Sequence, residues 1–215
     1  MPQSLLFDMD GTLFQTNKIL EVSLEDTFAY LRSLHEWSAG TPTQKYREIM
    51  GVPLPVVWET LLPDHSDSIR ETANRFFQES LITNINQGKG ALYPHVGEVL
   101  HDLKQAGHSL FIASNGEVEY LQAIVSHFGL DAWVIETYSI QQIQSQNKTD
   151  LVRHILNKYH IETAAVIGDR LSDIHAAKYN GLMAVGCRFD FAQESELEQA
   201  DAVIDDLLEL RTLFL

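Results

Sequence analysis

Two aspartates, Asp8 and Asp10, follow a short apolar run near the start of the chain. If the chain is still extended there, side chains two residues apart point to the same side, so both carboxylates face one site. One could be an ionised nucleophile, while the other, when protonated, gives a proton to a leaving oxygen and later activates water. Taken alone, the pair is equally typical of a turn, because Asp-Gly is an ordinary turn signal.

Two further polar loops also follow apolar runs. After residues 110–113 comes the loop Ser114-Asn115-Gly116. After residues 164–167 comes the loop Gly168-Asp169-Arg170-Leu171-Ser172-Asp173. Between these two loops, Lys148 is the first residue of a helical pattern. In open α/β sheets, ligands bind beyond the carboxyl ends of the strands, so these loops are expected to gather at one edge. Each loop alone could be a plain strand-to-helix turn, and Lys148 a solvated lysine.

The elements that must position these residues are short buried strands alternating with amphipathic helices. The strand candidates are residues 5–7, 110–113 and 164–167, with weaker ones at 133–135, 183–185 and 202–204. Apolar residues recur at helical spacing over 96–103, 121–128 and 152–159. This alternation predicts a doubly wound, three-layer, Rossmann-like α/β domain with a parallel sheet.

The segment 14–90 has a different sequence pattern from the rest of the chain. Leu20, Leu24, Phe28, Leu31 and Leu34 follow a helical period, and no convincing strand appears. We therefore expect a core domain formed by residues 1–13 and 91–215, with residues 14–90 inserted as a helical domain.

The charge balance limits the partners. The chain has 215 residues, of which 30 are acidic and 15 basic, so its formal charge is −15. Such a field repels nucleic acid and anionic membranes, and a phosphate site would need its own local positive charge. The single cysteine, Cys187, excludes an internal disulfide. Without a secretory signal or an apolar run near 18 residues, we expect a cytoplasmic protein. Its expected oligomeric state is a monomer or homodimer.

The motifs, read together, resemble a known family. Asp8-Met9-Asp10-Gly11-Thr12, Ser114, Lys148 and Gly168-Asp169 with Asp173 occur in the order and spacing of the haloacid dehalogenase-like superfamily. The resemblance is to the phosphoglycolate phosphatase-like subgroup with a helical cap. It covers nearly the whole chain, through motifs in the core and through architecture alone in the insertion.

The resemblance implies a role for each matching residue. Asp8 would be the nucleophile and Asp10 the general acid and base. Mg²⁺ would be held by the Asp8 carboxylate, the Asp10 backbone carbonyl and Asp169, with Asp173 supporting directly or through water; oxygen ligands suit this hard cation.

Phosphate binding is implied in the same way. Ser114 and the backbone amides around Asn115 and Gly116 would bind the phosphoryl oxygens. Lys148 would neutralise Asp8 and the phosphate, which supplies the local positive charge.

The expected function is a Mg²⁺-dependent phosphatase that hydrolyses a small phosphorylated metabolite through an aspartyl-phosphate. Dehalogenases resemble the pattern at Asp8 but lack an acid at the place of Asp10, because a halide needs no proton. A phosphosugar mutase remains an alternative. A phosphonate hydrolase would need a cap lysine, which residues 47–51 lack and which only Lys45 could provide. A non-catalytic regulatory module is disfavoured, because no motif residue is lost.

Recognition of the rest of the substrate is expected to fall to the insertion. Lys45, Arg47 and Trp58 are the candidates. The alternative for Lys45 and Arg47 is a solvated side chain, and for Trp58 it is core packing.

Overall fold

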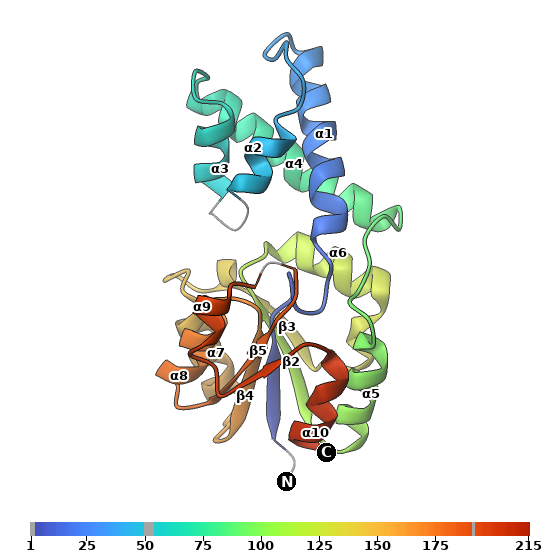
Figure 1. Cartoon of the computed structure of the whole chain (residues 1–215), viewed down its shortest axis with the longest axis vertical. Helices are drawn as coiled ribbons and strands as arrows, with labels where there is room; N and C mark the ends of the chain where they lie inside the picture. The colour runs from blue at the N-terminus through green and yellow to red at the C-terminus, as the bar shows by residue number, and fades with distance from the viewer. Residues whose placement is uncertain (1–2, 50–53, 191) are drawn as a thin grey trace. The chain divides into compact units, whose positions relative to one another are not determined.

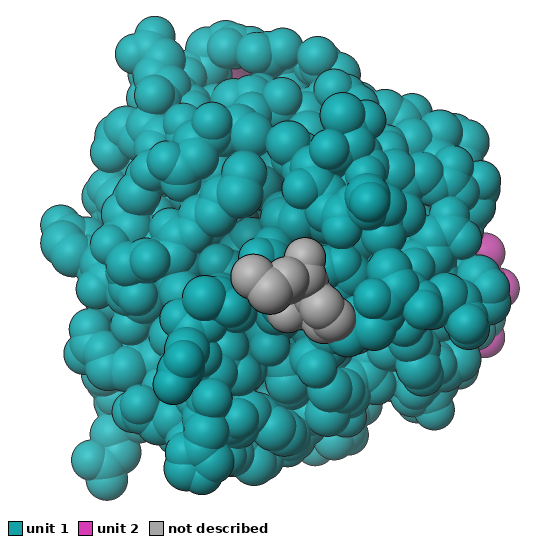
Figure 2. Space-filling view, turned by 90° about the horizontal axis from the view of Figure 1, so that it is seen from below, with its two compact units in different colours: residues 1–16, 91–215 teal, residues 17–90 magenta. Residues whose placement is uncertain are grey.

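The computed structural model describes residues 3–49, 54–190 and 192–215. The chain divides into two compact units, which Figure 2 colours separately: residues 1–16 with 91–215, and residues 17–90. Met50 and Gly51, part of the stretch considered for a cap lysine, lie outside the described residues.

The first unit is built on a six-stranded sheet in which every pairing is parallel (Figure 1). The strands are β1 (Ser4–Phe7), β2 (Ser109–Ser114), β3 (Glu136–Ser139), β4 (Ala164–Gly168), β5 (Met183–Cys187) and β6 (Ala202–Ile204). Their order in the sheet is β3-β2-β1-β4-β5-β6. The predicted doubly wound α/β core is therefore confirmed.

Strand β1 lies where the strand order reverses, between β2 and β4. Its last residue, Phe7, stands opposite Ile112 of β2 and Ile167 of β4. Because all three strands run the same way in this register, the loops that follow them begin at the same edge of the sheet. This is the place where open α/β sheets bind ligands.

Helices cover the sheet on both sides. They are α5 (Val96–Gln105), α6 (Val118–Phe128), α7 (Lys148–Tyr159), α8 (Leu171–Tyr179), α9 (Glu194–Leu197) and α10 (Leu210–Phe214), with short 3₁₀ turns at Leu130–Ala132, Ile140–Gln142 and Leu207–Glu209. Helices α7 and α8 lie on one face of the sheet, with α5 and α10 on the other (Figure 1).

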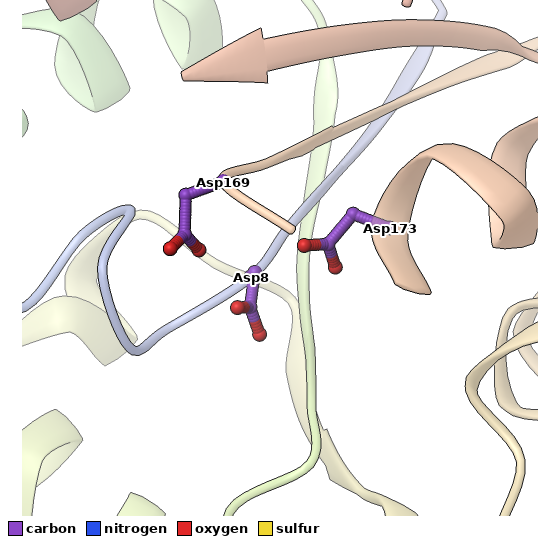
Figure 3. Close-up of side chains that lie close together, drawn as sticks. All are labelled: Asp8, Asp169 and Asp173. Atoms are coloured by element: carbon purple, nitrogen blue, oxygen red, sulfur yellow. The ribbon is translucent and has the colours of Figure 1, made fainter. Parts of the chain in front are cut away.

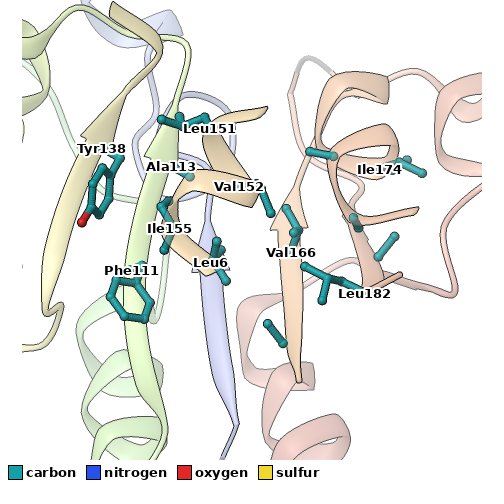
Figure 4. Close-up of a cluster of buried hydrophobic side chains, with 14 of the residues drawn as sticks. Leu6, Phe111, Ala113, Tyr138, Leu151, Val152, Ile155, Val166, Ile174 and Leu182 are labelled. Atoms are coloured by element: carbon teal, nitrogen blue, oxygen red, sulfur yellow. The ribbon is translucent and has the colours of Figure 1, made fainter. Parts of the chain in front are cut away.

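A buried apolar cluster joins α7 and α8 to the sheet. Leu6, Phe111 and Val166 of three neighbouring strands belong to it together with Val152 and Ile155 of α7 (Figure 4). Burying each such side chain stabilises the fold by roughly 1.5–3 kcal/mol. This packing holds α7, and therefore its first residue, Lys148, against the sheet.

One predicted strand was placed too early. Residues 133–135 were expected to be extended, but β3 begins at Glu136. The amides of Trp133 and Val134 donate instead to Leu130 O, at 3.0 and 3.1 Å, which continues the preceding 3₁₀ turn. Ile135 then donates to Leu110 O at 2.7 Å, just before the strand pairing starts. The apolar residues 133–135 therefore belong largely to a turn. A run of three residues is too short to show the alternation of side chains that distinguishes a strand.

The second unit is helical, as predicted for the insertion. It comprises α1 (Asn17–Ser33), α2 (Thr43–Glu48), α3 (Leu54–Leu61) and α4 (Asp67–Asn86). Phe28 of α1, Trp58 of α3 and Phe77 of α4 are buried within it. Within the described part of the chain, neither unit has a helix long and apolar enough to cross a membrane.

Candidate active site

Three buried charged side chains meet at the carboxyl edge of the sheet. Lys148 Nζ lies 2.6 Å from Asp8 Oδ1 and also forms an ion pair with Asp173 Oδ1. The exposed fractions are 6% for Asp8, 4% for Lys148 and 1% for Asp173. Apart from this ammonium group, no donor among the described residues satisfies either of the two carboxylate oxygens.

Asp169 completes a carboxylate cluster. Asp8, Asp169 and Asp173 come from the ends of β1 and β4 and from the first turn of α8, and their carboxylates lie close together (Figure 3). One oxygen of each lies within 4.8 Å of the others. Three buried carboxylates facing one ammonium group leave an excess of negative charge, and oxygen ligands in such a group suit a divalent cation. The residues present therefore fit a divalent metal ion.

The cluster perturbs the acidity of its own members. Burial, and then the charges of Asp8 and Asp173, raise the pKa of Asp169 to about 8. Burial also raises the pKa of Asp173, to about 6, against the lowering effect of Lys148. Burial alone would lower the pKa of Lys148, but the carboxylates of Asp173 and Asp8 outweigh it and raise that pKa. The lysine therefore stays charged at neutral pH.

The loop after β1 is shaped to approach Asp169. Gly11 has φ of +75°, and a Cβ at this position would collide with the Asp169 carboxylate. Thr12 Oγ1 donates to Asp169 Oδ1 at 3.3 Å. The Asp-Gly-Thr sequence therefore makes a left-handed turn that only glycine allows without strain, and brings the two loops together.

Ser114 ends β2, next to β1, and is 1% exposed. The Gly116 amide donates to Ser114 Oγ at 3.1 Å, which leaves the hydroxyl hydrogen to be donated. Ser139 Oγ donates to Gly116 O at 2.6 Å, so the end of β3 holds the loop in place. Asn115 is exposed at the tip of this loop.

The Asp10 carboxylate is not part of the cluster. Its Oδ1 accepts hydrogen bonds from Thr16 Oγ1 at 2.6 Å and from Tyr120 OH at 2.5 Å. Burial, and then the charge of Asp8, raise its pKa to about 6, while the two hydroxyls lower it. A carboxyl with this pKa can hold and release a proton near neutral pH.

Sequence reasoning missed the two hydroxyls that bind Asp10. Thr16 follows the first motif closely, so its proximity was a usable signal. Tyr120 lies in the first turn of α6 and gave no signal, because its contact with Asp10 depends on how that helix packs beside the loop after β1.

Other polar side chains considered from the sequence have partners of their own. Arg170, not assigned to catalysis, pairs with Glu196 at 3.0 Å. In the helical unit, Arg47 pairs with Glu21, and Lys45 Nζ donates to Thr60 O at 2.5 Å. Trp58 is 2% exposed and its indole donates to Asn74 Oδ1 at 2.9 Å, which favours the packing alternative for this residue.

The arrangement agrees with a comparison of the whole sequence with protein families. The model described as haloacid dehalogenase-like hydrolase matches residues 5–187. The chain belongs to the haloacid dehalogenase-like hydrolase family. The resemblance inferred from the motifs is thereby confirmed, and the protein is a hydrolase by family.

Curated relatives of this hydrolase include phosphatases. A 5′-nucleotidase from Pseudomonas aeruginosa is 25% identical over 197 residues, covering 90% of this chain and 86% of the relative. A phosphoglycolate phosphatase from Haemophilus influenzae is 25% identical, covering 96% of each chain. The structure of CbbY from Rhodobacter sphaeroides in complex with phosphate superposes with a TM-score of 0.79 at 22% identity, covering 98% of this chain and 96% of that one. At 22% identity, the similarity to the CbbY structure shows a shared fold.

Proposed function

We propose that this hydrolase is a Mg²⁺-dependent phosphatase that cleaves a small phosphate monoester through an aspartyl-phosphate on Asp8. The observation that carries the proposal is the ion pair of Asp8 with buried Lys148, 2.6 Å apart, beside the carboxylates of Asp169 and Asp173. The ammonium group pairs directly with the carboxylate of Asp8, the proposed nucleophile, and offers positive charge to an incoming phosphate.

In the first half of the reaction, a carboxylate oxygen of Asp8 forms a bond to phosphorus while the bond from phosphorus to the leaving alcohol breaks. The electron pair of the broken bond goes to the alcohol oxygen, which takes a proton from Asp10. The Ser114 hydroxyl and the amides around Gly116 bind the phosphoryl oxygens. Catalysis of this kind rests on positioning and charge stabilisation.

In the second half, Asp10 accepts a proton from a water molecule that attacks the same phosphorus. The bond between phosphorus and Asp8 then breaks, which restores the Asp8 carboxylate and releases inorganic phosphate. Asp10 finishes protonated, ready for the next substrate, so acid and base roles alternate on one side chain.

Asp8, Asp169 and the backbone carbonyl of Asp10 would hold Mg²⁺, with Asp173 in support, and the cation would neutralise the carboxylates and draw charge from the phosphoryl oxygens. Lys148, already paired with both Asp8 and Asp173, keeps these two side chains in place.

We further propose that the helical unit, residues 17–90 and predicted as 14–90, acts as a cap that reads the rest of the substrate and excludes water during phosphoryl transfer. The 5′-nucleotidase and phosphoglycolate phosphatase relatives support nucleoside monophosphates and small phosphorylated acids as the first substrates to test.

The deciding experiment combines a substrate panel with trapping of the intermediate. Purified protein is assayed against phosphate monoesters with Mg²⁺ and with EDTA, and an acid quench tests for covalent phosphate on the protein. Asp8→Asn should reduce turnover by at least about a thousandfold and abolish the trapped phosphate, because an amide cannot act as the nucleophile.

A matched control is Asp131→Asn, which makes the same change at an exposed position of the same unit. It should leave activity unchanged. Near-normal turnover by Asp8→Asn, or a panel on which the wild type cleaves no ester, would refute the proposal. Phosphate returned to the substrate rather than to water would indicate the mutase alternative.

A further inference from the structure

The carboxylate of Asp10 is held at a single oxygen by two hydroxyl groups from different elements. Tyr120 OH, from α6, and Thr16 Oγ1, from the segment that follows β1, both donate to Asp10 Oδ1, at 2.5 and 2.6 Å. Both distances are short, as expected for a hydroxyl donating to an ionised carboxylate.

This arrangement makes the two oxygens of Asp10 inequivalent. Oδ1 already accepts two O–H bonds, so a proton taken up by Asp10 goes to Oδ2, for which the described residues provide no donor. Two donors from different directions also restrict rotation of the carboxylate. The oxygen that must give and take the proton is therefore presented in one orientation, which lowers the entropic cost of proton transfer.

Tyr120 is suited to this task by its packing. It is 5% exposed, and its Cδ1 would lie 3.1 Å from a Cβ at position 116, so the ring lies directly against Gly116 in the loop proposed to bind phosphate. The same side chain thus contacts the phosphate loop through its ring and Asp10 through its hydroxyl.

We propose that Tyr120, assisted by Thr16, is a positioning residue that presents Asp10 Oδ2 to the leaving oxygen of the substrate and then to the attacking water. This rests on the proposed phosphatase function. Tyr120 itself does not touch the reacting atoms.

The test is the dependence of kcat/KM on the leaving group, measured for Tyr120→Phe with p-nitrophenyl phosphate, phenyl phosphate and an alkyl phosphate. kcat/KM reports phosphoryl transfer to Asp8, the step in which the leaving group needs a proton. Removing the hydroxyl should cost about tenfold with the alkyl phosphate and less than about twofold with p-nitrophenyl phosphate, since a good leaving group needs little protonation.

Companion variants separate positioning from packing. Thr16→Val should show the same pattern and Thr16→Ser, which keeps the hydroxyl, should resemble the wild type. Asp10→Asn should show it more strongly. Tyr179→Phe makes the same change at a side chain that is 71% exposed and should have no effect. Circular dichroism and thermal unfolding check that Tyr120→Phe folds; if it does not, the two Thr16 variants carry the test.

The outcomes distinguish this inference from the function on which it rests. An equal loss across the leaving groups would assign Tyr120 a purely structural role, and unchanged kcat/KM would assign it none; either overturns the inference while the phosphatase stands. A wild type that cleaves no ester on the panel would overturn both.

Discussion

Lys148 Nζ lies 2.6 Å from Asp8 Oδ1, although the two residues stand far apart in the sequence, and it also pairs with Asp173. Under the proposed function, the ammonium group supplies the local positive charge that a strongly acidic chain needs to bind phosphate. Lys148 is 4% exposed and the two carboxylates are buried with it, so these ion pairs offset part of the cost of burying their charge.

Replacing Lys148 with Met should therefore impair both activity and stability. The change leaves two buried carboxylates unpaired, a loss that costs about 3–5 kcal/mol when one partner of a buried pair is removed. We expect a lower unfolding midpoint in EDTA, measured by urea denaturation, and turnover reduced by at least about a hundredfold. Lys158→Met, at an exposed ion pair with Glu136, is the control. Wild-type stability of Lys148→Met would contradict the role of the pair.

Activity should depend strictly on Mg²⁺, because Asp8, Asp169 and Asp173 would otherwise repel one another. EDTA should abolish turnover and added Mg²⁺ restore it, as followed by phosphate release. Ca²⁺ should inhibit, since its larger and looser coordination shell would misplace Asp8 relative to phosphorus. Full activity in chelator would show that the cluster serves another purpose.

The metal-free protein should become less stable as the pH rises from 6 to 8. Burial raises the pKa of Asp169 to about 8, so the folded state binds this proton more tightly than the unfolded state. The resulting stabilisation is complete below the ordinary aspartate pKa and is lost as the pH rises through about 8. Thermal unfolding in EDTA at several pH values measures it.

Asp169→Asn provides the comparison for that measurement, because the amide does not titrate. Its unfolding temperature should vary less with pH than that of the wild type. The other acidic residues are the same in both proteins, so their effect on the pH dependence cancels in the comparison. Parallel curves for the two proteins would show that Asp169 is not the titrating group.

The helical unit offers a test that separates packing from recognition. Trp58 lies edge-on to Phe77, with ring centroids 5.6 Å apart, and is buried, so Trp58→Ala should destabilise the protein by about 3–5 kcal/mol, measured by denaturant unfolding. A small loss would show that the site collapses around the missing ring.

Arg47 is exposed and pairs with Glu21, so Arg47→Ala should leave stability unchanged. If the unit reads the substrate through this side chain, KM for a small phosphorylated acid should rise more than KM for p-nitrophenyl phosphate. Arg75→Ala, another exposed arginine of the unit, is the control. An unchanged substrate ranking would remove Arg47 from recognition.

The sequence by itself determined the class of fold and most of the candidate site. Runs such as Ala164–Gly168 are apolar throughout, which is typical of strands buried on both faces of a parallel sheet, and their polar loops identify the ligand-binding edge. These signals are local, because a few neighbouring residues carry each of them. The order of the motifs around Asp8, Ser114 and Asp169 then indicated the family.

Only the tertiary structure decided which side chains meet. The pairing of Lys148 with Asp8 depends on how α7 packs on the sheet, and the hydrogen bond from Tyr120 to Asp10 depends on how α6 lies beside the loop after β1. The start of β3 at Glu136 likewise depended on a turn in which the amides of Trp133 and Val134 donate to Leu130 O. Such contacts join residues distant in sequence, and they are set by strand register and helix packing rather than by the periodicity of any one segment.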